Sequence, residues 1–88
     1  MPREILTITN KRGLHARAAA KFVTLAGRFD AEVTVHKGGH QVSGGSIMGL
    51  MMLAAGMDAS IEIGARGRQA RPAVDALCRL VEAGFEET

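Results

Sequence analysis

The chain has very few aromatic side chains: it contains no Trp and no Tyr, and only three Phe among 88 residues. A hydrophobic core must therefore be built mainly from the aliphatic side chains that make up most of its 47% hydrophobic residues. Small nucleic-acid-binding domains commonly stack bases on exposed aromatic rings. The scarcity of such rings and a formal net charge of only +2 argue against a basic domain that binds nucleic acid.

Cysteine is also scarce, because Cys78 is the only one. A single cysteine excludes an internal disulfide and a cysteine-based metal cluster, and we place this one in the core. His36 and His40 flank a turn, but no nearby Cys, Asp or Glu completes a set of metal ligands. We interpret them as exposed hairpin histidines, and we expect neither a metal nor a cofactor.

Long hydrophobic runs are missing as well. The longest mostly apolar run, IMGLMMLAAGM, has about eleven residues, whereas a membrane-spanning helix needs about 20. The first residues, MPREILTITN, lack the basic segment and apolar stretch of a secretory signal. We therefore expect a cytoplasmic chain that does not insert into membranes.

The chain is short enough to be one domain over residues 1–88, and its patterns predict the order strand, helix, strand, strand, short helix, strand, helix. Alternating segments predict strands within residues 5–9, 32–36, 41–43 and 59–65. Helical spacing predicts helices over 16–26, from 46 to 56 and within 69–85. Four strands with one apolar face each need one layer of helices to cover them, which predicts a two-layer sandwich with a solvated sheet face.

The helices carry more detailed expectations. In the first, we expect a core-facing stripe and Gly27 as the C′ residue that closes the helix. The stripe consists of Ala16, Ala19, Ala20, Val23 and Ala26. In the second, which should end at Gly56, we expect Leu50, Leu53 and Ala54 on the sheet. In the third, Pro72 suits the first turn. Its expected stripe consists of Val74, Leu77, Cys78, Val81 and Phe85.

The stretch NKRGLHARAAAKF places a histidine at the expected start of the first helix. Helix N-termini carry unpaired N–H groups and a partial positive charge, which favour a neutral imidazole and a bound phosphate. His15 would then be a phosphoryl acceptor, Gly13 would form a left-handed turn before it, and Arg17 would bind phosphate oxygens. The alternative is that His15 caps the helix and Arg17 is merely solvated. The residues alone leave both open.

A second motif, GGSIMGLMMLAA, places Ser46 at the expected start of the second helix. Serine is a favoured N-cap, so capping alone would explain it. The helix that follows is too hydrophobic for all of its side chains to face inward. Ile47, Met48 and Met51 or Met52 should be exposed. A methionine stripe is more often core than interface, although methionine also suits surfaces that bind several partners.

Together, GLHARAAAKFV and SIMGLMMLAA resemble the histidine-containing phosphocarrier protein (HPr) family of the bacterial phosphotransferase system, over essentially the whole chain. The resemblance implies an α+β open-faced sandwich, with a four-stranded antiparallel sheet covered on one face by three helices. It implies a monomeric carrier rather than an enzyme, with His15 accepting phosphate on Nδ1 from phospho-enzyme I and donating it to an enzyme IIA domain. Arg17 would stabilise the phosphate, and Lys11 and Arg12 would attract acidic partners.

The resemblance also implies a regulatory phosphorylation of Ser46 by HPr kinase/phosphorylase and a partner-binding surface beside the histidine. That surface would consist of Ala16, Ala20, Lys21, Ile47, Met48 and Met51. Many family members have proline where this chain has Ala18, and the alanine leaves an additional N–H donor. This difference suggests the nitrogen-related proteobacterial branch. The alternative function is a purely regulatory protein that acts through Ser46.

Overall fold

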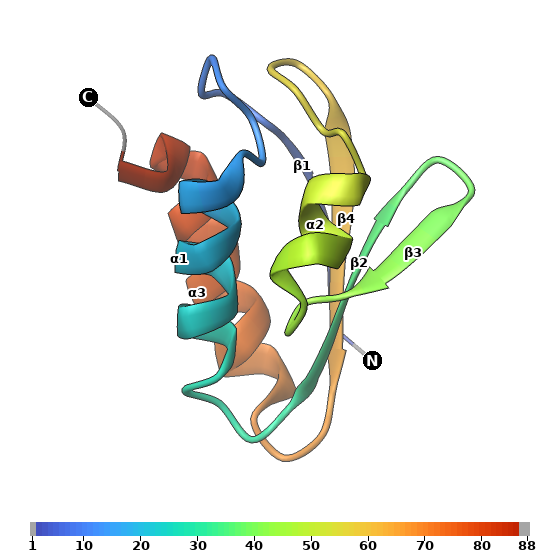
Figure 1. Ribbon diagram of the computed structural model, residues 1–88. Coiled ribbons are helices and arrows are strands. Elements are labelled where there is room, and N and C mark those ends of the chain that lie inside the picture. The colour runs from blue at the N-terminus through green and yellow to red at the C-terminus, as the bar shows by residue number, and fades with distance from the viewer. Residues whose placement is uncertain (1, 87–88) are drawn as a thin grey trace.

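The computed structural model describes residues 2–86, and Figure 1 shows a sheet with its helices packed against it. The elements are β1 (Arg3–Thr7), α1 (Ala16–Ala26), β2 (Glu32–Lys37), β3 (His40–Ser43), α2 (Ile47–Met52), β4 (Ser60–Arg66), α3 (Ala70–Glu82) and a 3₁₀ turn, η1 (Gly84–Glu86). This order agrees with the order predicted from the sequence, with the short turn added at the end. No helix in the described part of the chain is both long and apolar enough to cross a membrane.

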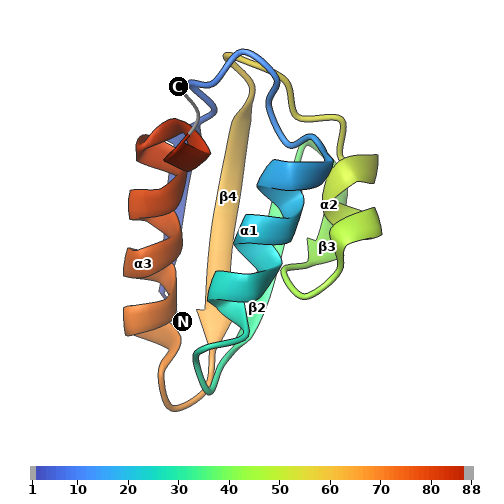
Figure 2. The ribbon, with the colours of Figure 1, turned by 60° about the vertical axis from the view of Figure 1, so that its left-hand side comes forward.

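The four strands form one antiparallel sheet in the order β1-β4-β2-β3. The three helices cover one face of it, and Figure 2 shows α1 between α3 and α2. The predicted α+β open-faced sandwich is therefore confirmed. Because β1 and β4 pair antiparallel, with Thr7 opposite Ser60, the loop that enters α1 and the loop that leaves α2 meet at one end of the molecule (Figure 1).

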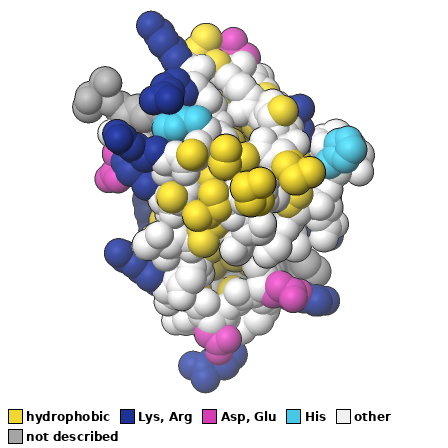
Figure 3. Space-filling view, viewed as in Figure 1, with side chains coloured by type: hydrophobic (Ala, Val, Ile, Leu, Met, Phe, Trp, Pro, Cys, Tyr) yellow, Lys and Arg dark blue, Asp and Glu magenta, His cyan; other side chains and the backbone are white. Residues whose placement is uncertain are grey.

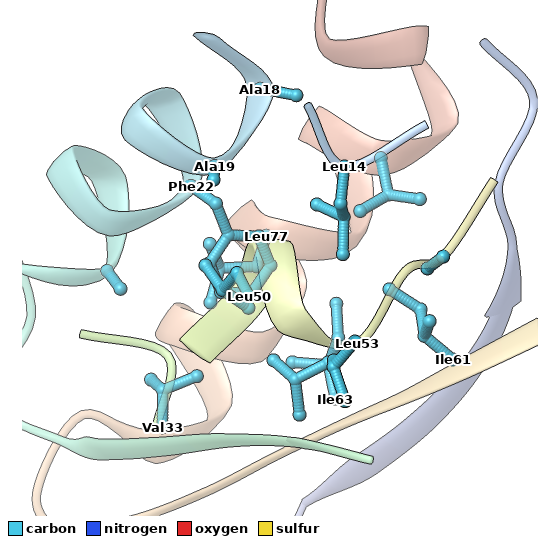
Figure 4. Close-up of a cluster of buried hydrophobic side chains, with 14 of the residues drawn as sticks. Leu14, Ala18, Ala19, Phe22, Val33, Leu50, Leu53, Ile61, Ile63 and Leu77 are labelled. Carbon is cyan, nitrogen blue, oxygen red and sulfur yellow. The ribbon is translucent and has the colours of Figure 1, made fainter. Parts of the chain in front are cut away.

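The core lies between the sheet and the helices. Alternation in β2 and β4 points Val33, Val35, Ile61 and Ile63 inward, and all four are buried. Leu50, Leu53 and Leu77 meet them from the helical layer (Figure 4). Only two large aromatic side chains, Phe22 and Phe85, are fully buried, which agrees with a core that is mainly aliphatic.

The inward face of α1 differs from the predicted stripe. Ala18, Ala19, Phe22 and Ala26 are buried, whereas Ala16 is exposed and Ala20 and Val23 are only half-buried. Phe22 fills the space between sheet and helix, so the buried face of the helix includes its bulkiest side chain together with Ala18 and Ala19 (Figure 4). Gly27 closes the helix as predicted, at the C-cap position with φ −66°.

The helices α2 and α3 also end differently from the predictions. Helix α2 stops at Met52, and Ala54 takes φ +52° and is exposed, so Ala55 rather than Ala54 is buried behind Leu53. Helix α3 stops at Glu82, and Phe85 reaches the core from a left-handed turn at φ +57° instead of from a further helical turn. Ending the two helices early therefore allows Ala55 and Phe85 to be buried in the core.

Candidate functional site

His15 lies at the N-cap position of α1, with extended backbone angles and a half-buried side chain. Its carbonyl accepts the first helical hydrogen bond, from the N–H of Ala19 at 2.9 Å. The side chain makes no capping hydrogen bond to the helix. The alternative that His15 caps the helix is therefore confirmed for its position only, because the residue occupies the N-cap but its side chain makes no capping hydrogen bond.

The backbone before His15 is held against the segment that follows α2. Gly13 has φ +62°, as predicted for the turn, and the N–H of Leu14 donates to the Ala55 carbonyl at 2.9 Å. A Cβ on Gly13 would lie 2.2 Å from that carbonyl oxygen and 2.7 Å from the Cα of Gly56. Only glycine allows this approach, which brings the start of α1 beside the end of α2.

Asn10 is a part of this arrangement that sequence reasoning missed. Its side chain is buried, and its Nδ2 donates to the Gly13 carbonyl at 3.0 Å, while the N–H of Gly13 donates to the Asn10 carbonyl at 3.2 Å. Both bonds close the turn in front of the histidine. An asparagine three residues before a glycine is a common turn signal, so the sequence contained the information that would have found it.

The first turn of α1 has the N–H groups of Ala16, Arg17 and Ala18, which have no acceptor within the helix because the first intrahelical bond begins at Ala19. Ala18 itself is 1% exposed, so its methyl group packs into the core (Figure 4). Arg17 is exposed and makes no ion pair with a carboxylate in residues 2–86. The helix start therefore offers backbone donors and one adaptable guanidinium beside a histidine.

Ser46 is the N-cap of α2, as predicted. Its Oγ accepts a hydrogen bond from the N–H of Gly49 at 2.9 Å, and the residue is half-buried. Gly49 is closely surrounded, since a Cβ there would lie 3.1 Å from this Oγ and 3.2 Å from the Cβ of Val42. The hydroxyl thus has a structural role in the helix, and this role does not preclude its modification.

The exposed side of α2 forms a hydrophobic surface that we call the methionine patch. It consists of Ile47, Met48, Met51 and Met52, which are 40%, 67%, 39% and 78% exposed. Figure 3 shows hydrophobic side chains gathered over α1 and α2, with a histidine and several Lys and Arg side chains at the edge of this area. The predicted exposure of this surface beside the start of α1 is confirmed.

The three α1 residues predicted to belong to the partner-binding surface do not lie on one side of the helix. Ala16 is exposed near the helix start, but Lys21 lies on the side of α1 that faces α3. Its Nζ donates to the Phe85 carbonyl at 2.8 Å and lies 3.8 Å from the carboxylate of Glu86. Ala20 lines the same side. Lys21 therefore holds the C-terminal turn, while Ala16 stays exposed at the start of α1.

The remaining candidates have structural explanations. His36 Nε2 is 2.7 Å from Gln41 Oε1 and its Nδ1 is 3.7 Å from Glu62, so it is not simply a solvated hairpin residue, while His40 is exposed. No group of three His, Cys, Asp or Glu suited to a metal occurs among the described residues. Cys78 is half-buried beside the core, and its burial, aided by the nearby carboxylate of Glu4, raises the pKa of its thiol to about 11.

Comparisons with known proteins agree on one family. The family model described as "PTS HPr component phosphorylation site" matches residues 3–83. The phosphocarrier protein NPr of Shewanella violacea is 49% identical to the chain over 82 residues, which are 93% of this chain and 90% of that protein. The phosphocarrier protein HPr of Pseudomonas putida is 49% identical over 88 residues, 99% of this chain and 98% of that protein.

Solved structures give the same result. The crystal structure of HPr-C-His from Thermoanaerobacter tengcongensis superimposes with a TM-score of 0.95 at 38% identity, and the match covers 100% of this chain and 99% of that one. The likeness therefore extends over sequence and fold alike, and it includes both motifs and the elements that connect them.

Proposed function

The chain belongs to the HPr family of the phosphotransferase system, and from this premise we propose that it carries its phosphoryl group on His15. A phosphocarrier function is common to the relatives and to this chain. One observation supports the choice of residue: His15 occupies the N-cap position of α1, and its side chain makes no capping hydrogen bond there. The ring is thus beside backbone donors that a phosphoryl group needs.

In the proposed transfer, Nδ1 of His15 attacks the phosphorus of a phosphohistidine on enzyme I. A new P–N bond forms while the P–N bond of the donor breaks, and no water or cofactor takes part. The N–H groups of the first turn and the guanidinium of Arg17 then bind the phosphoryl oxygens. These N–H groups have no acceptor within the helix, and Arg17 has no carboxylate partner in residues 2–86, so they bind the phosphoryl group without first breaking other bonds. Since they hold it only by hydrogen bonds and charge, the group can still be transferred to an enzyme IIA domain.

We assign partner docking to the methionine patch together with Ala16, and the long-range attraction of acidic partners to Lys11 and Arg12, which are exposed. Ala20 belongs to this surface only at its edge, and Lys21 contributes through the turn that it holds. The protein acts as a monomer in the cytoplasm in this proposal. The similarity to an NPr favours a nitrogen-related acceptor as well as a sugar-transport one.

Incubation with enzyme I and radiolabelled phosphoenolpyruvate tests the proposal. The wild-type protein should acquire acid-labile, base-stable phosphate, as expected for a phosphohistidine, and His15→Ala should acquire none. His40→Ala is the matched control, since His40 is exposed on β3, and it should label like the wild type. Equal labelling of His15→Ala and the wild type would overturn the assignment.

We also propose that Ser46 is a regulatory phosphorylation site for an HPr kinase/phosphorylase. The support is its position: Ser46 immediately precedes Ile47 and Met48 of the methionine patch. A phosphate there adds about 1.5 to 2 negative charges at pH 7. Such a charge would repel an acidic partner and slow the transfer to His15. Incubation with the kinase and ATP should give acid-stable phosphate, and Ser46→Ala should remain unlabelled; labelling of both would refute the site.

A purely regulatory protein that acts only through Ser46 is the alternative. The arrangement of Asn10 and Gly13 argues against it, because both residues shape the turn that presents His15 and neither is needed for Ser46 to cap α2. The labelling experiment with His15→Ala distinguishes the two functions directly.

A further inference from the structure

A groove separates α1 from α3, on the side of α1 away from the methionine patch. Its volume is about 580 Å³, and eleven residues line it: Arg17, Ala20, Lys21, Thr24, Leu25, Arg28, Ala76, Arg79, Leu80, Ala83 and Glu86. This surface, which we call the α1–α3 groove, has no part in the proposed phosphoryl transfer except that Arg17 stands at one end of it.

The walls of the groove combine two kinds of side chain. Small or half-buried hydrophobic residues form the floor, namely Ala20, Leu25, Ala76, Leu80 and Ala83. Basic residues form the rim, namely Arg17, Lys21, Arg28 and Arg79, and Glu86 is the only acidic residue that lines it within residues 2–86. Alanines in the floor allow another backbone to approach closely, and the rim favours negative charge.

Three of the four rim cations lack a carboxylate partner among the described residues, whereas the fourth, Lys21, lies near Glu86, and most arginines outside the rim are paired. Arg3, Arg66, Arg68 and Arg71 each pair with a carboxylate, on the sheet or at the start of α3. In contrast, Arg17, Arg28 and Arg79 pair with no carboxylate among the described residues. Positive charge is therefore left uncompensated along the groove, and Figure 3 shows Lys and Arg side chains along the edge of the molecule where Figure 1 draws α1 and α3.

The spacing of the cations indicates the kind of ligand. Arg17 lies in the first turn of α1 and Arg28 lies two residues beyond its end at Ala26, and the nine helical steps from Arg17 to Ala26 alone span about 14 Å at 1.5 Å per residue. A small anion reaches one of these cations, whereas an elongated ligand reaches both. The lining residues recur every three or four positions on α1 and on α3, as they do where a third helix packs between two others.

We propose that the α1–α3 groove docks an amphipathic helix of a partner protein, with a hydrophobic stripe flanked by acidic side chains. The stripe lies on the alanines and leucines of the floor, and the acidic flanks meet Arg17, Arg28 and Arg79. This site is separate from the methionine patch, so one carrier can hold such a partner while the patch remains accessible.

Nuclear magnetic resonance on the ¹⁵N-labelled, unphosphorylated protein tests the proposal independently of any transfer at His15. The probe is a synthetic helical peptide of about 18 residues, ~27 Å long, with a leucine stripe flanked by glutamates. We expect saturable shifts of amides in α1 and α3, with little change in α2, and weaker binding as the salt concentration rises. The same peptide with lysine in place of glutamate should not bind.

The variant Arg28→Glu should weaken binding by about fivefold or more, because it replaces an attraction with a repulsion. Arg68→Glu is the matched control: it changes the net charge equally, but Arg68 does not line the groove, and binding should stay unchanged. The proposal is overturned by an absence of shifts at millimolar peptide, by shifts centred on α2, by equal binding of the lysine peptide, or by an equal effect of both variants.

Discussion

At the scale of single residues, Gly13 is the position on which the presentation of His15 depends most directly. A left-handed glycine is predicted here from the sequence. The structure shows why no other residue fits: the Ala55 carbonyl and Gly56 lie against the position that a Cβ would take. The contact with a segment more than forty residues away is tertiary, so no local pattern could reveal it. The role of Asn10 is different, because its bonds to Gly13 are local and the turn signal that indicates them is present in the sequence.

Gly13→Ala should destabilise the fold by about 3 kcal/mol, because strain at a positive φ adds to overlap with the Ala55 carbonyl. Gly38→Ala is the control, since Gly38 has a similar φ of +59° but nothing within 4 Å of its Cβ position, and it should cost about 1 kcal/mol. Urea unfolding of the two variants measures both values. Equal losses would show that the contact with Ala55 is unimportant.

Cys78 provides a second prediction at this scale. Its burial and the carboxylates of Glu4, Glu82 and Asp75 raise the pKa of the thiol from 9.0 to about 11. The thiolate fraction at pH 8 is therefore about a hundredfold lower than in the unfolded chain. Iodoacetamide should alkylate the native protein correspondingly more slowly than the protein in denaturant. Equal rates would contradict the assigned environment.

The same shift affects stability in a definite direction. Since folding favours the protonated thiol, the stabilisation from this group is complete below pH 9 and is lost as the pH rises through about 11. Sequence analysis placed Cys78 in the core, whereas it lies half-buried at the core's edge, because the stripe on α3 is centred on Val74, Leu77 and Val81.

At the scale of elements, the order of all four strands and three helices followed from periodicity, although β1 begins two residues earlier than predicted. The residues that face inward followed less well. Alternation has a period of two, so the inward side chains of β2 and β4 are easily recognised. The run of alanines in α1 has no strong stripe of its own, and the burial of Phe22 decides its orientation. The ends of α2 and α3 depend on left-handed residues, Ala54 and Phe85, which local propensity does not favour.

The first turn of α1 gives a prediction for Ala18, where many members of the family have proline. Ala18→Pro removes an N–H that has no acceptor within the helix, so it should cost less than about 1.5 kcal/mol and leave labelling of His15 intact. Ala20→Pro, two residues later, removes a helical hydrogen bond and should cost about 3 kcal/mol or more. Denaturant unfolding compares the two, and similar costs would refute the assigned helix start.

The cap of α2 supports a further comparison. Ser46→Ala loses the hydrogen bond from the Gly49 N–H and should reduce the free energy of unfolding by about 1 kcal/mol. Ser46→Asp retains an acceptor at the cap and should recover most of this loss, while its charge slows transfer from enzyme I. Thermal unfolding and a transfer assay separate the two effects; a slow transfer by Ser46→Ala itself would assign the effect to the cap rather than to charge.

At the scale of the whole molecule, the two faces have different roles. One sheet face is solvated, while the helical layer carries His15, the methionine patch and the α1–α3 groove (Figures 1 and 3). The sequence predicted the sandwich and the exposure of α2, since a short helix with apolar residues all round cannot bury every side. The groove could not be predicted, because it depends on how α1 and α3 lie against each other.

This division predicts different effects for two similarly exposed hydrophobic residues. Met48 is 67% exposed on α2, and Ile5 is 72% exposed on β1. Met48→Gln should lower the rate of transfer from enzyme I at subsaturating concentration by about tenfold, because a partner no longer buries the methionine. Ile5→Gln should leave the rate unchanged. Equal effects would place the docking surface elsewhere.

The central claim is that His15, of the three histidines in the chain, carries the phosphoryl group. Nuclear magnetic resonance with ¹⁵N-labelled histidine tests it most directly, since it follows the imidazoles of His15, His36 and His40 in one sample. After addition of enzyme I and phosphoenolpyruvate, only the Nδ1 signal of His15 should shift and couple to phosphorus. A phosphorus-coupled signal from His36 or His40, or no such signal at all, would contradict the claim.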